Sequence, residues 1–474
     1  MRRVTRVVII GGGPGGYEAA LVASQLGGEV TLVDTDGLGG SAVLTDCVPS
    51  KTLIATAEVM TQVDESGELG IRFGTKDDVP AETAIHVDLA AVNRRVLDLA
   101  DRQSGDIARR LLDAGVTIVE GRGRLDGPER VIAETADGEQ ALDADVILVA
   151  TGAHPRVLPD AVPDGERILT WTQVYALDEL PEKLIVVGSG VTGAEFASAY
   201  DALGAEVVLV SSRDRVLPGE DADAAQVLED VFERRGLTVL SKARAASVTR
   251  DGDQVTVALT DGREVTGSHC LLAVGSIPNT ADMGLEEAGV TLDRGGFIGV
   301  DKVSRTSSRG IYAAGDCTGV LMLASVAAMQ GRIAMWHALG DAVAPLDLKI
   351  VSSNVFTAPE IATVGMSQTQ ADVAVPKVAT VKLPLQGNAR AKMQGFRDGF
   401  VKVFCLPVTG IVVGGVVVAP RASELIYPLA IAVSERLTVD QVANSFTVYP
   451  SVSGSLAEAA RQLHLHGTDL VPKE

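Results

Sequence analysis

One glycine-rich segment occurs twice in this chain, each time between two runs of apolar, β-branched residues. The first copy reads Gly-Gly-Gly-Pro-Gly-Gly over residues 11–16, between apolar runs at 7–10 and 29–34. The second copy reads Gly-Ser-Gly-Val-Thr-Gly over 188–193, with equivalent runs at the same distances. The copies align without a gap at an offset of 177 residues, which is 188 minus 11. One such motif is a weak signal, but two in register indicate two nucleotide-binding units.

Each turn has the residues that binding of a dinucleotide requires. Glycines permit a tight turn and let the backbone approach a pyrophosphate, and the N-terminus of the next helix offers free N–H groups to that anion. We therefore expect helices over about 17–26 and 194–203. The alternative, two glycine-rich turns in an ordinary α/β sheet, is disfavoured by the shared spacing. The candidate binding residues here are Gly11, Gly13, Pro14, Gly16, Gly188, Gly190 and Gly193.

The two units differ at the end of their second strand. Asp34 ends the first and can accept hydrogen bonds from both ribose hydroxyls of an adenosine, which fits FAD or NAD. Ser211 stands at the matching position of the second and is followed by Ser212 and Arg213. Loss of the acid removes repulsion against a 2′-phosphate, and Arg213 can pair with it. The second unit therefore favours NADPH, with NADH possible, unless Arg213 is only a solvated surface charge.

Composition narrows the function classes. The 474 residues suggest about three domains. A net charge of −21 argues against a nucleic acid or an anionic membrane as partner. There is no secretory signal and no apolar run of 18 residues, so we expect no integral membrane segment. The four cysteines lack CxxC or metal-ligand spacing, which indicates no metal site and a reducing cytoplasm.

The segment 39–51 reads Gly-Gly-Ser-Ala-Val-Leu-Thr-Asp-Cys-Val-Pro-Ser-Lys. It resembles the redox segment of the flavin-dependent disulfide reductases, such as lipoamide dehydrogenase and glutathione reductase. That family has a second cysteine five residues before the first, where this chain has Ala42. A lone thiol at Cys47 cannot form the disulfide that carries electrons to a substrate. The resemblance therefore implies the family's fold without its dithiol chemistry.

The resemblance covers residues 1 to about 460 and implies an α/β protein of three parts. Two Rossmann-like domains bind FAD and NAD(P), and an α+β C-terminal domain forms a homodimer in which each active site draws on the partner subunit. The implied boundaries are 1–153 and 276–345 for the FAD domain, 154–275 for the NAD(P) domain and 346–474 for the dimerisation domain.

The resemblance also implies roles for individual residues. Lys51 and Glu195 pair beside the flavin, Asp316 binds the FAD ribitol, and a helix from about Leu323 points at the flavin. For Cys47 two interpretations remain open: a thiolate whose pKa is lowered by the helix N-terminus and Lys51, or an inert buried thiol. The further cofactor-binding residues implied are Gly121, Thr151, Gly152, Gly275 and Ala324.

The family's second half-site is a histidine near the C-terminus that acts as acid–base on the substrate thiol. In this chain the matching run extends from Val448 to Glu458, and two alignments place Tyr449 or Ser453 at the histidine position. Neither side chain titrates near neutral pH. Thiol acid–base chemistry is therefore not supported, whichever alignment holds.

Both losses affect the same half-reaction and leave the transfer from NAD(P)H to FAD intact. Within the family, the chain looks like the actinobacterial NAD(P)H:quinone reductases that lack the redox disulfide. Hydride would pass from NADPH to FAD beside Glu195, and then to a quinone on the opposite face, lined by Ala42, Val43 and Cys47. The alternatives are a soluble pyridine-nucleotide transhydrogenase and a non-catalytic flavoprotein subunit or redox sensor.

Overall fold

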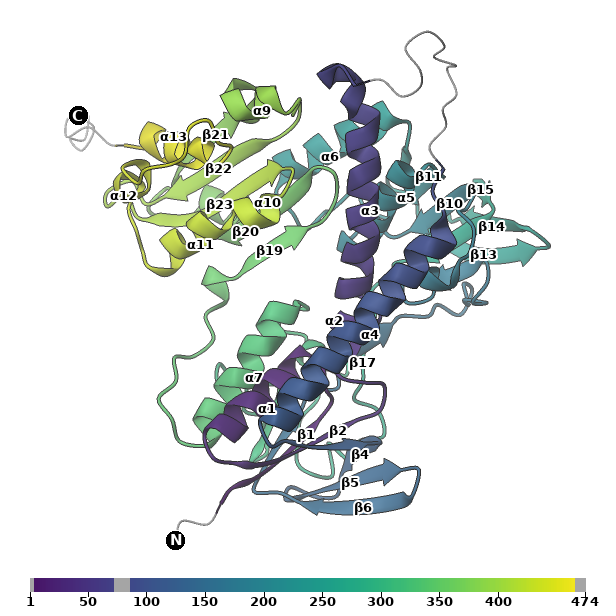
Figure 1. Ribbon diagram of the computed structural model, residues 1–474, viewed down its shortest axis with the longest axis vertical. Coiled ribbons are helices and arrows are strands. Elements are labelled where there is room, and N and C mark those ends of the chain that lie inside the picture. Colours follow the sequence, from purple (N-terminus) through teal and green to yellow (C-terminus); the bar gives the residue numbers. More distant parts are fainter. Residues whose placement is uncertain (1–3, 72–85, 465–474) are drawn as a thin grey trace.

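Three five-stranded sheets organise the chain in this computed structural model, which describes residues 4–71 and 86–464 (Figure 1). Two of the sheets are parallel and one is antiparallel. The expected α/β class with a separate α+β C-terminal part is confirmed.

The first sheet contains the first glycine unit. Its order is β18 (Ile311–Ala313), β7 (Val146–Val149), β1 (Arg6–Ile10), β2 (Glu29–Asp34) and β3 (Thr117–Glu120), and all neighbours are parallel. Buried β-branched and leucine side chains on both faces explain why these short runs form central strands. The helices α1 (Pro14–Gln25) and α7 (Ala324–Ala338) pack together on one face. A Cβ at Gly331 would lie 2.0 Å from the carbonyl oxygen of Gly15, so glycine is required where these helices cross.

The second sheet repeats this arrangement around the second glycine unit. Its order is β12 (Thr238–Leu240), β11 (Glu206–Val210), β10 (Lys183–Val187), β16 (His269–Leu272) and β9 (Ile168–Thr170), again all parallel. The helices α5 (Val191–Leu203) and α6 (Ala222–Arg235) belong to this unit.

Helices α1 and α5 each begin three residues before the expected start. The expectation was late because it excluded the glycine-containing first turn of each helix, which in α1 begins with Pro14. Proline is well suited to the first helical position, where its missing N–H would be unpaired in any case.

Antiparallel segments supplement each parallel sheet. The first has β4 (Arg122–Leu125), β5 (Arg130–Thr135) and β6 (Gly138–Asp143), and the second has β13 (Ala245–Asp251), β14 (Gln254–Leu259) and β15 (Glu264–Gly267). The chain leaves the first unit through β8 (Ala153–Pro155) and returns through β17 (Ser276–Pro278), and these strands pair with each other.

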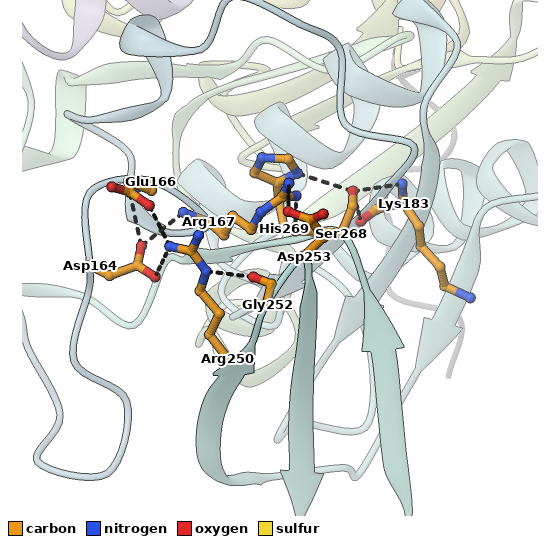
Figure 2. Close-up of polar contacts among 9 residues, drawn as sticks. All are labelled: Asp164, Glu166, Arg167, Lys183, Arg250, Gly252, Asp253, Ser268 and His269. Atoms are coloured by element: carbon orange, nitrogen blue, oxygen red, sulfur yellow. Dashed lines mark hydrogen bonds and ion pairs between the residues drawn. The ribbon is translucent and has the colours of Figure 1, made fainter.

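Figure 2 shows the polar cluster that fastens the β13–β15 hairpins to the second parallel sheet. Arg250 binds Asp164 at 3.1 Å and Glu166 at 2.6 Å, while Arg167 binds Asp253 at 2.6 Å. Burial, together with both arginines, lowers the pKa of His269 to about 4, so this histidine is neutral at pH 7. Because His269 begins β16, the cluster lies at the opposite end of the sheet from the glycine turn.

The third sheet is antiparallel and lies at one end of the molecule, green to yellow in Figure 1. Its order is β19 (Ser352–Val355), β20 (Glu360–Gly365), β23 (Val412–Ala419), β22 (Phe400–Cys405) and β21 (Ala379–Pro384). The helices of this part are α8 (Gln368–Val373), α9 (Ala389–Met393), α10 (Ala422–Leu425), α11 (Tyr427–Ser434), α12 (Val439–Ala443) and α13 (Gly454–Gln462).

A buried lysine joins the second unit to the third sheet. Lys402 of β22 places its Nζ 2.9 and 2.7 Å from the two carboxylate oxygens of Asp221, which caps α6, and 2.7 Å from Asp223. Lys402 is 2% exposed and the Asp221 side chain 3%, so this pair is fully removed from solvent.

Three helices connect the units: α2 (Gly40–Leu44), α3 (Cys47–Glu65) and α4 (Leu89–Asp113). Helix α3 packs against both α4 and α5, which brings the Cys47 segment to the second glycine unit. Within the described ranges, no helix combines the length and the apolar composition needed to cross a bilayer.

Candidate active site

The two glycine turns have the same geometry. Gly11 and Gly188 have φ angles of +101° and +115°, and a Cβ at either would lie within 2.3 Å of a carbonyl oxygen at the end of the adjacent strand. A Cβ at Gly16 or Gly193 would lie 1.8 Å from the carbonyl oxygen of the first glycine in its own turn. These four glycines are therefore required for the turn and for the close approach of the helix to the strand.

The start of each helix is left open to an anion. Gly13 is the N-cap of α1, with Pro14 as its first residue, and Gly190 is the N-cap of α5. Among the described residues, no side chain caps either helix, and neither first turn holds an acidic residue. The free N–H groups and the positive end of each helix dipole fit a pyrophosphate group at both turns.

Asp34 is held beside the first turn by backbone donors. Its Oδ2 accepts a hydrogen bond from Gly12 N at 2.6 Å, and its Oδ1 accepts one from Gly37 N at 2.7 Å. Burial raises the pKa of Asp34, and these N–H donors oppose that shift. These bonds hold the carboxylate in one position beside the turn, where the sequence predicts a contact with ribose.

Ser211 takes the matching position in the second unit and is fully buried. Its Oγ lies 2.7 Å from Ser189 Oγ and accepts a hydrogen bond from Arg213 N at 3.1 Å. Ser212 and Arg213 are exposed beside it. Ser211 therefore orders the loop, while the two residues after it remain free to meet a ligand.

Asn279, which the sequence analysis missed, joins the two segments where the chain passes between the units. Its side-chain amide donates to Thr151 O at 2.8 Å, and its backbone N–H donates to Gly152 O at 3.0 Å. Its backbone carbonyl accepts a hydrogen bond from Thr151 Oγ1 at 2.7 Å. Gly152 and Gly275 both adopt positive φ, and the space where a side chain would point is open at each. Gly121 follows β3 and lies beside the end of β2, where its N–H donates to Asp34 O at 2.9 Å.

Asp316 follows β18 and is largely buried. Burial, reinforced by the charge of Asp46, raises the pKa of Asp316 to about 6. Leu323 is the N-cap of α7 and Ala324 its first residue, as expected. The start of α7 also has no capping side chain among the described residues.

Lys51 and Glu195 form an ion pair between α3 and α5, with Nζ and Oε2 2.8 Å apart. Burial raises the pKa of Glu195, although Lys51 opposes this shift. Burial is the largest effect on the pKa of Lys51 and would lower it, but the charge and hydrogen bond of Glu195, together with Cys47 and Asp46, outweigh burial and the pKa is raised. The resemblance thus predicted that these two residues, 144 positions apart in the sequence, lie side by side.

Phe356, which follows β19, completes this contact and was not foreseen. Its N–H donates to Glu195 Oε1 at 2.9 Å, and its ring centroid lies 4.9 Å from Lys51 Nζ. The ion pair therefore touches all three parts of the chain. The sequence contains no local signal for this contact, because it depends on how the third sheet docks.

Of the two interpretations left open for Cys47, its surroundings do not favour the thiolate. Burial, followed by the charge of Asp46, raises the pKa of the thiol to about 11, and the opposing effect of Lys51 is smaller. The second interpretation, a protonated and unreactive thiol, fits the structure. All four cysteines are free.

The C-terminal run offers no replacement for the missing histidine within the subunit. Tyr449 is 86% exposed, and Ser453 Oγ donates to Ser451 Oγ at 3.1 Å. Glu458 instead pairs with Arg461, which helps lower its pKa to about 2. Over residues 4–71 and 86–464, neither candidate is paired with a carboxylate that would make it a base.

Comparison with known proteins identifies the family to which the chain is similar. The family model described as pyridine nucleotide-disulphide oxidoreductase matches residues 5–331, and the model of that family's dimerisation domain matches 351–460. A Mycobacterium tuberculosis protein named NAD(P)H dehydrogenase (quinone) is 55% identical over 473 residues, covering 98% of this chain and 94% of that protein. The crystal structure of LpdA from Mycobacterium tuberculosis superposes with a TM-score of 0.92 at 55% identity, covering 98% of this chain and 100% of that one. The dihydrolipoyl dehydrogenase of Zymomonas mobilis is 33% identical, with 96% of both chains covered.

Proposed function

Because the chain belongs to the pyridine nucleotide-disulphide oxidoreductase family, we propose that it is a FAD-dependent NAD(P)H:quinone oxidoreductase. The observation that carries this proposal is an intact Lys51–Glu195 pair beside a lone, protonated Cys47. The residues expected beside the flavin during hydride transfer are present, whereas the second cysteine and the histidine that disulfide reduction requires are absent.

The chain's own residues fit both cofactors of the family. The open start of α1 fits the pyrophosphate of FAD, and Asp34 fits its ribose. Asp316 fits the ribitol, and the start of α7 fits the flavin ring. When bound, FAD accepts hydride from NAD(P)H and passes two electrons onward. Lys51 supplies a positive charge beside this site, and Glu195 holds Lys51 in one position.

The second unit is proposed to prefer NADPH. Arg213 is exposed at the end of β11, and the position that would hold a repelling acid is Ser211. A guanidinium beside a 2′-phosphate forms a charge-assisted pair that NADH cannot form.

The acceptor is proposed to approach α2 and the start of α3. Ala42 and Cys47 are half-buried there, and Val43 is buried. These side chains are small, and Cys47 is uncharged because of its raised pKa. A planar, weakly polar quinone suits such a surface, whereas a thiol substrate would need a base.

Assembly and location are also proposals. The chain has the dimerisation domain of its family, which supports a homodimer. Four unpaired cysteines fit the reducing cytoplasm.

The proposal is tested by Ala42→Trp, with the neighbouring exposed Ser41→Trp as a matched control on the same helix. In anaerobic rapid mixing, NADPH should bleach the flavin of both variants at the wild-type rate. Reoxidation by a quinone should fall by at least about tenfold in Ala42→Trp alone, equivalent to about 1.4 kcal/mol. If Ala42→Trp slows both steps equally, the acceptor does not bind on this face.

A transhydrogenase remains the second candidate, because such an enzyme also needs neither the second cysteine nor the histidine. It is separated by measuring hydride transfer from NADPH to an NAD analogue. Transfer faster than quinone reduction would replace the quinone assignment.

A further inference from the structure

Asp46 lies directly before Cys47, and the mechanism above leaves it unused. Its backbone is held on both sides, because its N–H donates to Ser41 O at 2.8 Å and its carbonyl accepts from Ser50 N at 2.7 Å. Asp46 is the N-cap residue of α3, yet its carboxylate does not cap the helix. Within the part of the chain that the structure describes, no donor binds this carboxylate. The backbone of Asp46 is therefore held in place, while its carboxylate is not committed to a structural bond.

The surroundings of Asp46 contain more negative than positive charge. The cation in this cluster, Lys51 Nζ, is bound to Glu195 at 2.8 Å. Burial raises the pKa of Asp46, and the charge of Lys51 only opposes this shift. The ionisable groups that face this cluster are Cys47 and Lys51 of α3, Glu195 of α5, Asp316 after β18 and Tyr175 of the 3₁₀ turn Val174–Ala176.

We propose that Asp46 is the proton donor to the quinone. The inference rests on the proposed function, since it assigns the second hydrogen of that reaction. Reduction of a quinone to a hydroquinone requires two electrons and two protons. Hydride from NADPH, delivered by way of the flavin, provides both electrons and one proton. The O–H bond of the Asp46 carboxylic acid breaks, an O–H bond forms on the second quinone oxygen, and the carboxylate regains a proton from water.

Neighbouring groups are poorly suited to this role. The Cys47 thiol has a pKa of about 11, which makes it a poor donor at neutral pH. Lys51 is held by Glu195, and donation from it would leave that buried carboxylate unpaired. A carboxylic acid with a raised pKa is the usual solution when an enzyme must donate a proton near neutral pH.

The test separates the two half-reactions of the holoenzyme with Asp46→Asn. Flavin bleaching by NADPH should stay within about twofold of wild type. Reoxidation by a quinone should fall by about 10²-fold, the usual contribution of a general acid. Ferricyanide accepts electrons without a proton, so it should reoxidise Asp46→Asn and wild type equally. Asp46→Glu should recover quinone reoxidation. Asp64→Asn, an exposed position on the same helix about 27 Å away, should behave as wild type.

The pH profile gives a further criterion. Wild-type reoxidation by quinone should fall as pH rises through the pKa of Asp46, because only the protonated carboxyl donates. Asp46→Asn should show no such fall. Equal quinone rates and profiles in the variant and wild type would overturn the role of Asp46 alone. If quinone fails to reoxidise even the wild type while ferricyanide succeeds, the proposed function itself is wrong.

A readout without turnover uses Cys47 as a reporter of the Asp46 charge. Alkylation by iodoacetamide, located by mass spectrometry, should favour Cys47 because the other three cysteines are buried. At a fixed pH above the pKa of Asp46 and below that of the thiol, Asp46 is ionised, so Asp46→Asn should raise the alkylation rate several-fold, and Asp46→Glu should restore the wild-type rate. An unchanged rate would mean that the Asp46 carboxyl does not lie in this cluster, and would overturn the proposal.

Discussion

Replacement of Lys402 by methionine tests whether the joint between α6 and the third sheet depends on a buried charge. The substitution keeps the length of the side chain and removes its ammonium group. Asp223 is 46% exposed and keeps Lys382 at 2.9 Å, so it has both water and a second cation. Asp221 is 3% exposed and, among the described residues, would keep two backbone N–H donors, from Asp223 and Ala224. The loss therefore falls mainly on Asp221.

The expected loss of stability follows from the burial of Asp221. Removal of one partner of a buried ion pair costs about 3–5 kcal/mol, because the other charge is left unpaired. Hydrogen exchange of the α6 amides (residues 222–235) should accelerate by about 10² to 4 × 10³-fold in Lys402→Met, as about 1.4 kcal/mol corresponds to a factor of ten. Amides of α1 serve as the internal control, since α1 does not contact this joint.

A compensating variant distinguishes charge from packing. Lys402→Met combined with Asp221→Ser removes both charges and keeps a residue that caps helices well. Exchange in α6 should then return to within about tenfold of wild type, because paired removal of buried charges is often neutral. If Lys402→Met alone leaves exchange unchanged, or if the double variant is as fast as the single one, the buried charge is not what holds the joint.

Three further predictions concern the cofactor sites and the hairpin cluster. Arg213→Ala should weaken NADPH by about 1–3 kcal/mol and leave NADH unchanged in equilibrium titrations; an equal loss for both nucleotides would leave Arg213 as a surface charge. Lipoamide and glutathione disulfide should give no more than trace turnover in steady-state assays, and robust reduction of either would show that Ala42 has been aligned wrongly. The three backbone N–H donors and Arg250 hold the pKa of Asp164 at about 2 despite its partial burial, so this carboxylate stabilises the fold above about pH 4 and the contribution is lost as pH falls towards 2. The stability lost between pH 6 and pH 3, measured by thermal unfolding, should therefore be smaller in Asp164→Asn than in wild type.

The duplicated units were predictable because their determinants are local. The glycine spacing fixes the turn, the β-branched runs fix the strands, and Asp34 and Ser211 follow from the alignment of one copy on the other. The Lys51–Glu195 pair was also predictable, but only through resemblance to a family, since no pattern in the chain links residues 144 positions apart.

What the sequence did not reveal depends on burial by distant segments. A lowered pKa was one of two interpretations open for Cys47, because the helix N-terminus and Lys51 are close in sequence. Burial raises the pKa instead, and the charge of Asp46 adds to that effect. Phe356 was missed for the same reason, since its N–H reaches Glu195 only after the third sheet docks. Asp46, directly before Cys47, was a signal that the sequence offered and that the sequence analysis did not use.

The pairing of Ser189 with Ser211 constrains how mutations could alter the proposed nucleotide preference. The first unit has glycine at the equivalent of Ser189, and its N–H binds the Asp34 carboxylate directly. In the second unit an aspartate introduced at 211 would meet the Ser189 hydroxyl, and would lie beside the carbonyl oxygens of Arg213 and Arg215, which Ser211 Oγ now approaches at 3.3 and 3.4 Å. Substitution of Ser189 by glycine would remove the hydroxyl and leave the two carbonyl oxygens in place. An aspartate at 211 therefore also requires a rearrangement of the loop at residues 213–215 before its carboxylate can meet a ribose.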